Sequence, residues 1–449
     1  MRETKDSGVE WIDTIPEDWF VVPLKTEVSF GKGLPITKEN LIEKGVAVVS
    51  YGQIHSKMNT GSHLKEELIR YVSEDYLQKN PECLAQKGDI FVADTSEDYD
   101  GVGNAVLIDW DGDVFAGYHT VIIRPRNKQY SKYLSYLFMT DAWRSQLRSR
   151  ASGIKVYSVT QGLLKKTEII IPNSVYVQRL TDYLDRKCSA IDNIITKQEQ
   201  IIEKLKEYKL ALITETVTKG LNSDVELIES GIEWIGKIPI TWSIGKLSLL
   251  FDFVGGYAFN SDDYISETEY QVIRIGNVKN DNMLLDSNPV YVSKDTAEKA
   301  SRFEIKEGYI LFTMTGTKGK RDYFFTCLVD ASNLCNKRLF INQRVGAFVH
   351  HKDVCAGYYK YLLKETRILD SIFLYETGTA NQGNLGIDTI RRTKVQIPPF
   401  NEQCRIAKYL DDKCIKLNNE VEQRELIINR LLEYKKALIY EVITGKKEV

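Results

Sequence analysis

The sequence YLDRKC at Tyr183–Cys188, followed by EYKLALI at Glu207–Ile213, recurs as YLDDKC at Tyr409–Cys414 and EYKKALI at Glu433–Ile439. The second copy follows the first at a constant offset of 226 residues. About twenty identities fall in the matched window, where ordinary residue frequencies would give about three. A fixed long period indicates a duplicated architecture. The 449 residues therefore contain two related halves.

The segments that follow Pro172 and Pro398 are predicted to be helices of roughly 45 residues, because neither contains Pro or Gly before Gly220 and Gly445. Apolar residues recur every seven positions in each segment, with a second series four residues later, which predicts a seam covered by a partner helix. The seam residues are Leu184, Cys188, Ile191, Ile195, Ile202, Leu205 and Leu212 in the first helix, and Leu410, Cys414, Leu417, Val421, Ile428, Leu431 and Leu438 in the second.

Each of these helices is about 65 Å long at 1.5 Å per residue, which is longer than a small domain is wide. The first leaves one domain and delivers the chain to the next, so the second can pair with it only by running back. We therefore expect an antiparallel pair. Gln198 and Arg424 occupy equivalent seam positions near the two midpoints. A central polar layer that fixes the register is our hypothesis for these two residues.

A second pair of matching segments opens the two halves. SGVEWIDTIPEDW at Ser7–Trp19 corresponds to SGIEWIGKIPITW at Ser230–Trp242, at an offset of 223 residues. Between the matched ends the two halves diverge, apart from short patterned similarities. The halves thus share a frame and differ in their contents.

The divergent segments, about residues 16–171 and 239–397, are predicted to be mixed α/β domains. Short β-branched and aromatic runs bounded by Gly, Asn and Asp indicate strands. These runs are Val46–Tyr51, Asp89–Ala93, His119–Arg124, Tyr270–Ile275, Tyr309–Thr313 and Arg344–Val349. Tyr130–Leu147 and Ala356–Phe373 are predicted helices, placed alike in the two halves.

The predicted fold class is α+β, with a pseudo-twofold internal repeat. Two mixed α/β domains are separated by a pair of long antiparallel coiled-coil helices. The predicted division is 1–172 for the N-terminal segment and first domain, 173–220 for the first helix, 221–398 for the second domain and 399–449 for the second helix.

Composition places the chain among ordinary globular proteins. Hydrophobic residues make up 43% and charged residues 27%, and no apolar stretch is long enough for a membrane span. Met1–Glu10 is charged and shows no secretion signal, so we expect a cytoplasmic protein. The seven cysteines lack metal-ligand spacing and are predicted to be reduced thiols.

The net charge of −2 argues mildly against DNA binding, but the charge is unevenly distributed. Val121–Thr160 contains eight basic residues and one acid, which makes it a candidate DNA footprint. Gly88–Ile123 contains eight acids and no Lys or Arg, and should face away from phosphates.

Catalytic motifs are missing or incomplete. Ile397-Pro398-Pro399-Phe400 imitates an amino-methyltransferase motif, but Ile397 cannot accept a hydrogen bond from the target amine. It also aligns with Ile171-Pro172, so the start of a helix is the favoured interpretation. Glu304-Ile305-Lys306 resembles the end of a nuclease motif without the preceding Pro-Asp, and the five histidines lack metal-ligand spacing.

The paired Gly-hydrophobic-Glu-Trp-Ile segments and the paired Tyr-Leu-Asp and Glu-Tyr-Lys helices resemble the specificity subunits of type I restriction-modification systems. The resemblance covers nearly the whole chain, and its doubled order is specific. One departure concerns Gln403, which follows the family's Pro…Gln pattern in the second helix, while Val177 holds the equivalent place in the first.

This resemblance implies a DNA-binding protein whose two target-recognition domains each read one half of a split DNA site. The helices would act as a ruler and bind two modification subunits, which carry S-adenosylmethionine and methylate adenine. A restriction subunit that uses ATP and Mg would cleave unmethylated DNA. The chain itself would be non-catalytic and hold no cofactor and no metal. Two similar domains about a pseudo-twofold axis would present equivalent surfaces to opposite strands.

Candidate DNA contacts follow from side-chain chemistry, since Lys and Arg hold phosphates while Arg, Asn and Gln read bases. The candidates in the first domain are Lys32, Lys38, Ser50, Gln53, Lys155 and Tyr157. Those in the second are Tyr257, Asn260, Arg274, Asn277, Lys318, Lys320, Arg321, Asn381 and Gln382.

Two other functions compete with this prediction. One is a self-contained DNA methyltransferase or nuclease, which the missing motifs disfavour and which methyl transfer by the purified chain would establish. The other is a coiled-coil adaptor that binds proteins only, which sequence-specific retention of a split DNA site would exclude.

Overall fold

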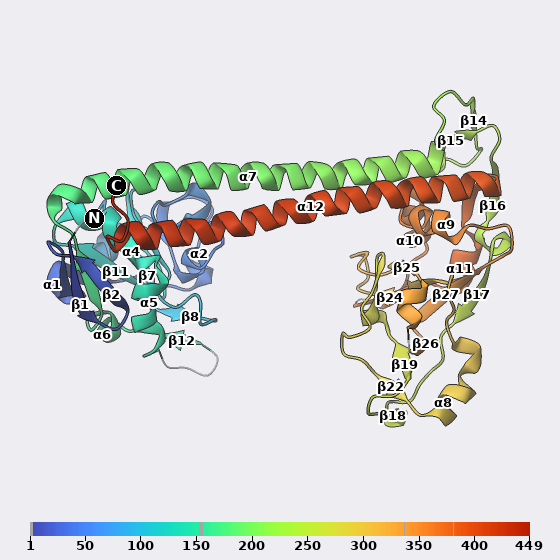
Figure 1. The fold of residues 1–449 in the computed structure, drawn as a ribbon, viewed down its shortest axis with the longest axis horizontal. Coiled ribbons are helices and arrows are strands. Elements are labelled where there is room, and N and C mark those ends of the chain that lie inside the picture. Colours follow the sequence, from blue (N-terminus) through green and yellow to red (C-terminus); the bar gives the residue numbers. More distant parts are fainter. Residues whose placement is uncertain (1–2, 152–155, 336, 380) are drawn as a thin grey trace. The chain divides into compact units, whose positions relative to one another are not determined.

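The computed structural model describes residues 3–151, 156–335, 337–379 and 381–449, which form two compact units (Figure 1). Unit 1 consists of Met1–Glu199 together with Glu425–Val449, and unit 2 consists of Gln200–Arg424. Each unit therefore contains one divergent segment and part of each long helix.

The core of unit 1 is built from two sheets. A four-stranded antiparallel sheet has the order β4-β11-β7-β9, and a three-stranded sheet has the order β10-β5-β6, with β10 and β5 parallel. Both sheets contribute to one buried apolar cluster. The strands are β4 (Val28–Lys32), β5 (Val46–Val49), β6 (Arg70–Val72), β7 (Ile90–Ala93), β9 (Ala105–Leu107), β10 (Val114–Ala116) and β11 (Thr120–Pro125).

Unit 2 repeats the four-stranded sheet of unit 1 and adds one strand, β18, to the edge of the second sheet. Its four-stranded antiparallel sheet has the order β17-β27-β23-β25, and its second sheet has the order β18-β22-β19-β26, with β19 and β26 parallel. The strands are β17 (Phe251–Gly255), β18 (Tyr264–Ile265), β19 (Tyr270–Ile273), β22 (Tyr291–Val292), β23 (Ile310–Thr313), β25 (Thr326–Leu328), β26 (Arg338–Ile341) and β27 (Val345–His350). The predicted internal repeat is thus present in the topology.

Small sheets complete each unit. Unit 1 adds β1 (Thr4–Val9) with β2 (Ile12–Pro16), β3 (Phe20–Pro23) with β13 (Glu168–Ile171), and β8 (Thr95–Ser96) with β12 (Tyr157–Ser158). Unit 2 adds β14 (Leu227–Glu229) with β15 (Lys237–Pro239), β16 (Ser243–Lys246) with β30 (Lys394–Ile397), β20 (Val278–Lys279) with β21 (Asn282–Met283), and the three strands β24 (Thr315–Gly316), β28 (Thr377–Thr379) and β29 (Gln382–Asn384).

All six predicted strand runs are strands, with small differences at their ends. The two predicted short helices each divide in two: α4 (Ser131–Phe138) and α5 (Asp141–Arg148) in unit 1, and α9 (Ala356–Leu362) and α10 (Thr366–Phe373) in unit 2. Side-chain caps start the second helix of each pair, because Thr140 accepts from the Trp143 N–H and Glu365 accepts from the Ile368 N–H. The other short α-helices are α1 (Leu24–Glu27), α2 (Tyr51–Ile54), α3 (Tyr76–Lys79), α6 (Gln161–Leu164), α8 (Lys294–Lys299) and α11 (Ile387–Arg392).

The two long helices have about the predicted length, as α7 spans Ser174–Lys219 (46 residues) and α12 spans Phe400–Ile443 (44 residues). Glycines with positive φ follow both, at Gly220 and Gly445. The Ile397-Pro398-Pro399-Phe400 motif joins β30 to the first residue of α12, which confirms the helix-start interpretation.

Within each unit the two long helices run antiparallel. In unit 1 the Lys435 ammonium lies 2.7 Å from both carboxylate oxygens of Asp192, while the end of α12 reaches the start of α7. In unit 2 the Lys209 ammonium donates to the Asn418 side chain at 2.8 Å, and Gly220 lies against Glu402. The seam residues Leu184, Cys188, Ile191, Ile195 and Ile202 of α7 are buried, as are Leu410, Cys414 and Leu438 of α12.

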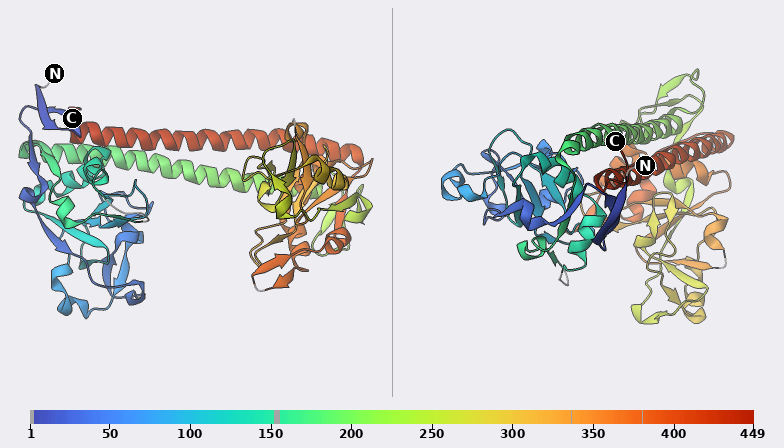
Figure 2. Two further views of the ribbon diagram at one scale, coloured as in Figure 1. Left: turned by 90° about the horizontal axis from the view of Figure 1, so that it is seen from below. Right: turned by 60° about the vertical axis from the view of Figure 1, so that its left-hand side comes forward.

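The first strands and the C-terminal residues lie side by side in unit 1 (Figure 2). Gly445 has a φ of +74° and packs against Pro16, where any side chain would collide. Gly220 is the equivalent residue in unit 2, where it has a φ of +81° and packs against Trp242.

Candidate nucleic-acid interface

A hairpin and a neighbouring loop bring together five of the predicted DNA contacts in unit 2. Strands β28 and β29 form the hairpin, and β24 pairs with β29 as the third strand. The loop after β24 lies against it, because the Lys318 ammonium donates to the Gly378 carbonyl at 3.3 Å. We call this group the hairpin surface; its members are Lys318, Lys320, Arg321, Asn381 and Gln382, all exposed.

Two carboxylates, Glu376 and Asp322, hold the loop of this surface in place. Glu376 accepts hydrogen bonds from the Tyr323 hydroxyl at 2.6 Å and from the Gly319 N–H at 3.1 Å. Asp322 accepts from the Thr317 N–H at 2.7 Å, and hydrogen bonds from Thr317 hold the pKa of Asp322 below its usual value. In the described part of the chain neither Lys318 nor Lys320 forms an ion pair with a carboxylate, so both exposed ammonium groups can contact a phosphate.

Arg321 differs from these lysines because it is already paired. Its guanidinium forms an ion pair with Asp370 and lies 5.7 Å from the centre of the Phe373 ring. These contacts fix the guanidinium at the end of α10. Arg321 thus supports the loop that carries Lys318 and Lys320.

A shallow hollow of about 420 Å³ opens beside the hairpin surface. Two of its lining residues, Gln343 and Arg344, are exposed and lie in the connection between β26 and β27. They carry the chemistry of base readers, yet they were not among the predicted contacts. The sequence predicts a strand that begins at Arg344, whereas β27 begins at Val345 and leaves Arg344 in the exposed connection.

Two further candidates lie next to this connection. The Gln343 N–H donates to the Tyr257 carbonyl at 2.9 Å, and the Asn342 N–H donates to the Ile273 carbonyl, directly before Arg274. Tyr257 is half-buried, with its ring centre 4.9 Å from that of Phe259. The Arg274 guanidinium donates to the Asn288 carbonyl at 2.6 Å.

Asn260 and Asn277 have structural roles. Asn260 is exposed and accepts from the Asp262 N–H at 3.3 Å. The Asn277 side chain is buried, and its amide donates to the carbonyls of Leu284 and Ser287 at 2.9 Å. Because all its polar atoms are used inside the loop, Asn277 has no surface to offer to DNA, and we correct its assignment to loop support.

In unit 1 backbone hydrogen bonds join the segments that carry Lys32 and Ser50 to the equivalent connection, between β10 and β11. The Gly33 N–H donates to the Thr120 carbonyl, and the Tyr51 N–H donates to the Tyr118 carbonyl. Lys32 is exposed and lines a hollow of about 590 Å³. Lys38 is exposed at the start of the 3-10 helix η1 (Lys38–Asn40).

Ser50 and Gln53 form the start of α2. The Gln53 side chain accepts from the Ser50 N–H at 3.2 Å, and Ser50 is buried while Gln53 is half-buried. Burial removes Ser50 from the solvent, so we correct its assignment to a helix cap. Tyr157 lies in β12, with its ring centre 5.8 Å from that of Tyr99, and Lys155 lies outside the described residues.

The predicted basic footprint at Val121–Thr160 is wrong for four of its cations. Arg124 binds the buried carboxylate of Asp89 at 2.7 Å, and Arg148 binds Asp141 at 2.8 Å. Lys132 binds Asp185 on α7, and Arg144 donates to the Phe138 carbonyl. These side chains hold unit 1 together and are not available as a continuous DNA-facing surface.

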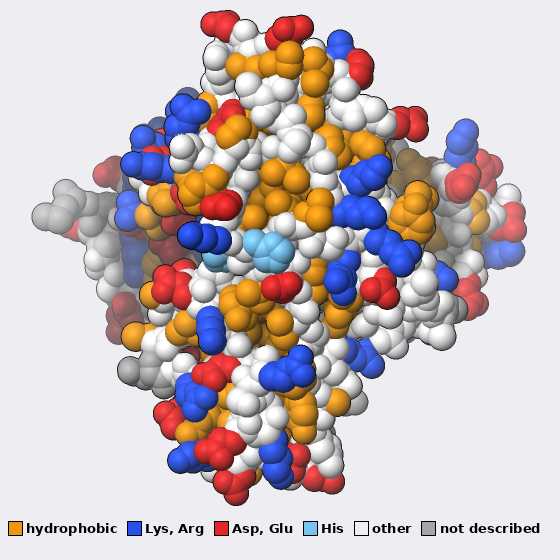
Figure 3. Space-filling model, turned by 90° about the vertical axis from the view of Figure 1, so that its right-hand side faces the viewer, with side chains coloured by type: hydrophobic (Ala, Val, Ile, Leu, Met, Phe, Trp, Pro, Cys, Tyr) orange, Lys and Arg blue, Asp and Glu red, His pale blue; other side chains and the backbone are white. Residues whose placement is uncertain are grey.

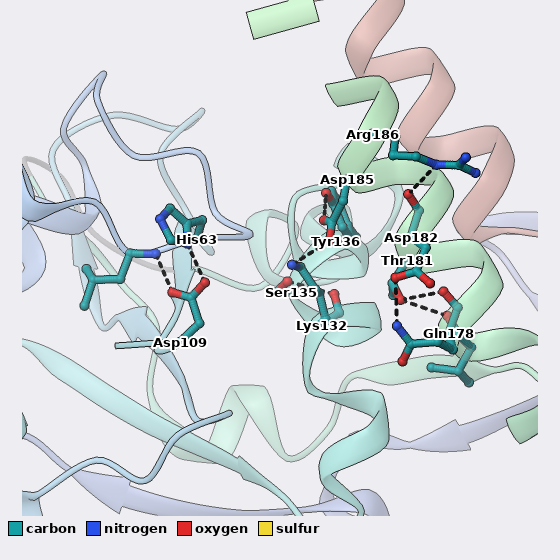
Figure 4. A network of polar contacts seen from close by, with 12 residues as sticks. His63, Asp109, Lys132, Ser135, Tyr136, Gln178, Thr181, Asp182, Asp185 and Arg186 are labelled. Carbon is teal, nitrogen blue, oxygen red and sulfur yellow. Dashed lines mark hydrogen bonds and ion pairs between the residues drawn. The ribbon is translucent and has the colours of Figure 1, made fainter. Parts of the chain in front are cut away.

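Equivalent polar contacts fasten the domains to the helices. In unit 1, Asp185 of α7 accepts from the Tyr136 hydroxyl at 2.7 Å and pairs with Lys132 at 2.6 Å (Figure 4). In unit 2, Asp411 of α12 accepts from the Tyr361 hydroxyl at 2.7 Å and pairs with Lys360 at 2.5 Å. Burial is the main cause that raises the pKa of both tyrosines, so each remains a hydrogen-bond donor at neutral pH.

The departure at Val177 also has a structural counterpart. In unit 2 the buried Gln403 amide donates to the Pro398 carbonyl at 2.8 Å. In unit 1 Val177 is buried in the core, and the Tyr130 hydroxyl donates to the Pro172 carbonyl at 3.0 Å. Each long helix is therefore preceded by a proline, Pro172 or Pro398, whose carbonyl oxygen accepts a hydrogen bond from a side chain.

Groups that could support chemistry are dispersed. Glu304 forms two hydrogen bonds with the Arg338 guanidinium, at 2.6 and 2.7 Å, so it is committed to an ion pair. Among the described residues, no group of three His, Cys, Asp or Glu side chains could hold a metal ion. No helix in the described part of the chain is long and apolar enough to cross a membrane.

The geometry defines a class of protein: two copies of a mixed α/β domain, each fastened to a long helix and each carrying cationic and amide side chains around one strand connection. The sequence model described as Type I restriction modification DNA specificity domain matches residues 16–216 and again residues 239–427. The chain belongs to this family.

Specificity subunits are among its relatives. The chain is 18% identical over 401 residues to the Type I restriction enzyme EcoKI specificity subunit of Escherichia coli (strain K12), covering 88% of this chain and 82% of that protein. It is 27% identical over 224 residues to the Type I restriction enzyme MjaVIII specificity subunit of Methanocaldococcus jannaschii, covering 47% of this chain and 49% of that protein.

Solved structures share the fold. One comes from work described as "Structural basis underlying complex assembly and conformational transition of the type I R-M system". Its TM-score is 0.68 at 15% identity, and the match covers 96% of this chain and 99% of that chain. Another is the HsdS subunit from Thermoanaerobacter tengcongensis, with a TM-score of 0.50 at 15% identity over 96% of this chain and 98% of that chain.

Proposed function

We propose that this chain is the DNA-reading specificity subunit of a type I restriction-modification complex, and that each recognition domain reads one half of a bipartite target. Residues 1–172 and 221–398 would carry the two recognition domains, and 173–220 and 399–449 the two spacer helices. The observation that carries the proposal is the shared frame with unlike contents: both units have a four-stranded antiparallel sheet in the same order and a second sheet with one parallel pair, while the residues at the hairpin surface have no identical counterparts in unit 1. Unlike contents imply unlike half-sites.

The chain would be non-catalytic and would direct adenine methylation and cleavage by partner subunits. The test is motif-resolved sequencing of adenine methylation in cells with and without this gene. We expect one split motif to lose methylation when the gene is deleted, and to regain it on complementation. Unchanged methylation would contradict the proposal and favour an adaptor. Methyl transfer by the purified chain alone would instead favour a self-contained enzyme.

We propose the exposed side chains around the strand connection as the DNA contacts. In unit 2 these are Lys318, Lys320, Asn381 and Gln382, joined by Gln343 and Arg344, and supported by Tyr257, Asn260, Arg274 and Arg321. In unit 1 they are the exposed Lys32 and Lys38 and the half-buried Gln53 and Tyr157. Lys155, which lies outside the described residues, is proposed from the sequence alone. Lysines would hold phosphates, while Arg344 and the amide side chains would read base edges in the major groove.

Replacing Arg344 or Gln382 with Ala should relax recognition of the half-site that unit 2 reads and leave the other half-site intact. A bidentate contact to a base contributes about 1–3 kcal/mol of discrimination, so the loss should be roughly tenfold or more at one base pair. The measurement is the methylation rate on duplexes that carry each single-base change. Asn282→Ala, at an exposed amide on β21, is the matched control. Equal relaxation in both half-sites would contradict the assignment.

The partners would be two modification subunits that bind the long helices. Tyr208 and Tyr434 are equivalent residues, and they are 56% and 52% exposed, respectively. The neighbouring Ala211 and Glu215 are exposed and identical to Ala437 and Glu441. These residues are spaced three and four apart, which makes one outward stripe on each helix. Identity at exposed positions indicates a partner that binds both helices alike.

Tyr208→Ala should release one modification subunit, and Tyr434→Ala the other. An interface tyrosine of this kind contributes about 2 kcal/mol, so each Kd should rise roughly 30-fold. Native mass spectrometry of the reconstituted complex would report the stoichiometry. Leu210→Ala and Lys436→Ala alter exposed equivalent positions whose residues differ, and they should leave assembly unchanged. Full assembly of the double tyrosine variant would contradict the proposed docking stripe.

A further inference from the structure

Two adjacent cations occupy the same place at the end of each recognition domain. Lys165 and Lys166 follow α6, and Arg391 and Arg392 end α11, at the offset of 226 residues that relates the two helices. All four side chains are exposed. The first domain has two lysines at this place and the second has two arginines, so both domains carry two positive charges there. The rest of the two domain sequences diverges.

The backbone at both pairs is built in the same way. The Leu24 N–H donates to the Thr167 carbonyl at 2.8 Å, and the Leu247 N–H donates to the Thr393 carbonyl at 2.9 Å. The residue before each pair, Leu164 or Ile390, is fully buried. Each cationic pair therefore projects from a rigid corner between a short helix and the last strand of its domain.

An aromatic ring positions the first cation of each pair. The Lys165 ammonium lies 5.6 Å from the centre of the Phe30 ring, and the Arg391 guanidinium carbon lies 5.7 Å from that of Phe253. Phe30 belongs to β4 and Phe253 to β17, the equivalent edge strands of the two four-stranded sheets. The same cation–π contact is thus built twice, with different cations.

No carboxylate in the described part of the chain forms an ion pair with any of these four cations. A cation near a helix C-terminus stabilises the helix dipole, which accounts for one charge but not for a second that points into solvent. Lys and Arg side chains also gather on the face of unit 2 drawn in Figure 3. The missing counter-charge should come from outside the chain.

We propose that Lys165–Lys166 and Arg391–Arg392 form a doubled phosphate clamp that binds the DNA backbone irrespective of base sequence. The inference rests on the proposed function, because it takes duplex DNA as the partner. The two half-sites differ in sequence, but both present the same phosphates. A contact kept in both divergent domains therefore fits the backbone rather than the bases.

The test measures the salt dependence of DNA binding by the complete complex of this chain with its modification subunits. The variants are K165A/K166A, R391A/R392A and their combination. The probes are a labelled duplex with the methylated motif and one without it. Each phosphate contact contributes about 0.9 to the slope of log affinity against log salt, so each pair should lower that slope by about 1 to 2 on both probes. The methylated motif should stay unchanged.

Two control experiments distinguish a specific phosphate contact at these pairs from the effect of removing any two positive charges. K165R/K166R and R391K/R392K keep the charge and should bind nearly as the unaltered complex does. K299A/R302A removes two exposed cations of unit 2 that have no equivalent pair in unit 1, where Glu82 stands in place of Arg302, and should change the slope less. An unchanged slope in the alanine variants, or an equal drop in K299A/R302A, would overturn the clamp alone. If the unaltered complex does not prefer the motif-bearing duplex, the proposed function fails as well.

Discussion

Exchanging Val21–Ile169 for the same segment of another family member should change one half of the methylated motif and leave the other half intact. Each mismatched base pair costs about 1–3 kcal/mol, so a new half-site of a few base pairs should redirect methylation by several orders of magnitude. The cut points suit the exchange because β3 and β13 pair with Val22 opposite Ile169 and Val21 opposite Ile170. The exchanged segment thus begins and ends at neighbouring positions of one strand pair, β3 and β13.

The graft must keep its attachment to the helices. Lys132 and Tyr136 bind Asp185, and the Tyr133 hydroxyl donates to the Ile443 carbonyl at 3.0 Å, so these three residues should be retained. The reciprocal exchange of Ile244–Val395, which ends at the equivalent strand pair β16–β30, is the matched control and should change the other half-site only. A change in both halves after either exchange would show that reading is not divided between the domains.

The frame could be predicted from the sequence because its signals are periodic. Heptads and uninterrupted lengths that end at Gly220 and Gly445 predict the helices α7 and α12. Short β-branched and aromatic runs bounded by Gly, Asn and Asp predict the strands. The breaks between α4 and α5 and between α9 and α10 could not be predicted, since no Gly or Pro marks them. A capping Thr140 or Glu365 looks like any polar residue in a helix.

The candidate DNA surface was only partly predictable, because it is assembled from distant segments. Gln343 and Tyr257 meet through a backbone hydrogen bond across 86 residues, and Lys318 meets Gly378 across 60. Ser50 and Asn277 were candidate DNA contacts because their side chains are polar. The sequence could not show that both side chains are buried. The central polar layer at Gln198 and Arg424 stays a prediction, because these residues belong to different compact units.

Inserting one heptad after Gln198 and a matching heptad after Arg424 should lengthen the preferred DNA spacer and preserve both half-sites. Seven helical residues add about 10.5 Å, or about three base pairs, together with about 100° of DNA twist. Some affinity should be lost to that twist. The contacts Asp192–Lys435 and Lys209–Asn418, each inside one unit, lie on either side of the insertion points along both helices. A whole heptad in both helices keeps these contacts and the apolar seam in phase.

Insertions of three or four residues are the matched control, because they rotate the seam and should disrupt the helix pair without creating a new spacer preference. The measurement is adenine methylation across a library of targets that differ only in spacer length. Circular dichroism of the purified subunit would show whether each variant remains folded. Since the heptad variant keeps its packing, a folded and active protein with an unchanged spacer would mean that the helices do not set the distance between half-sites. A shift of about three base pairs would establish α7 and α12 as the element that measures it.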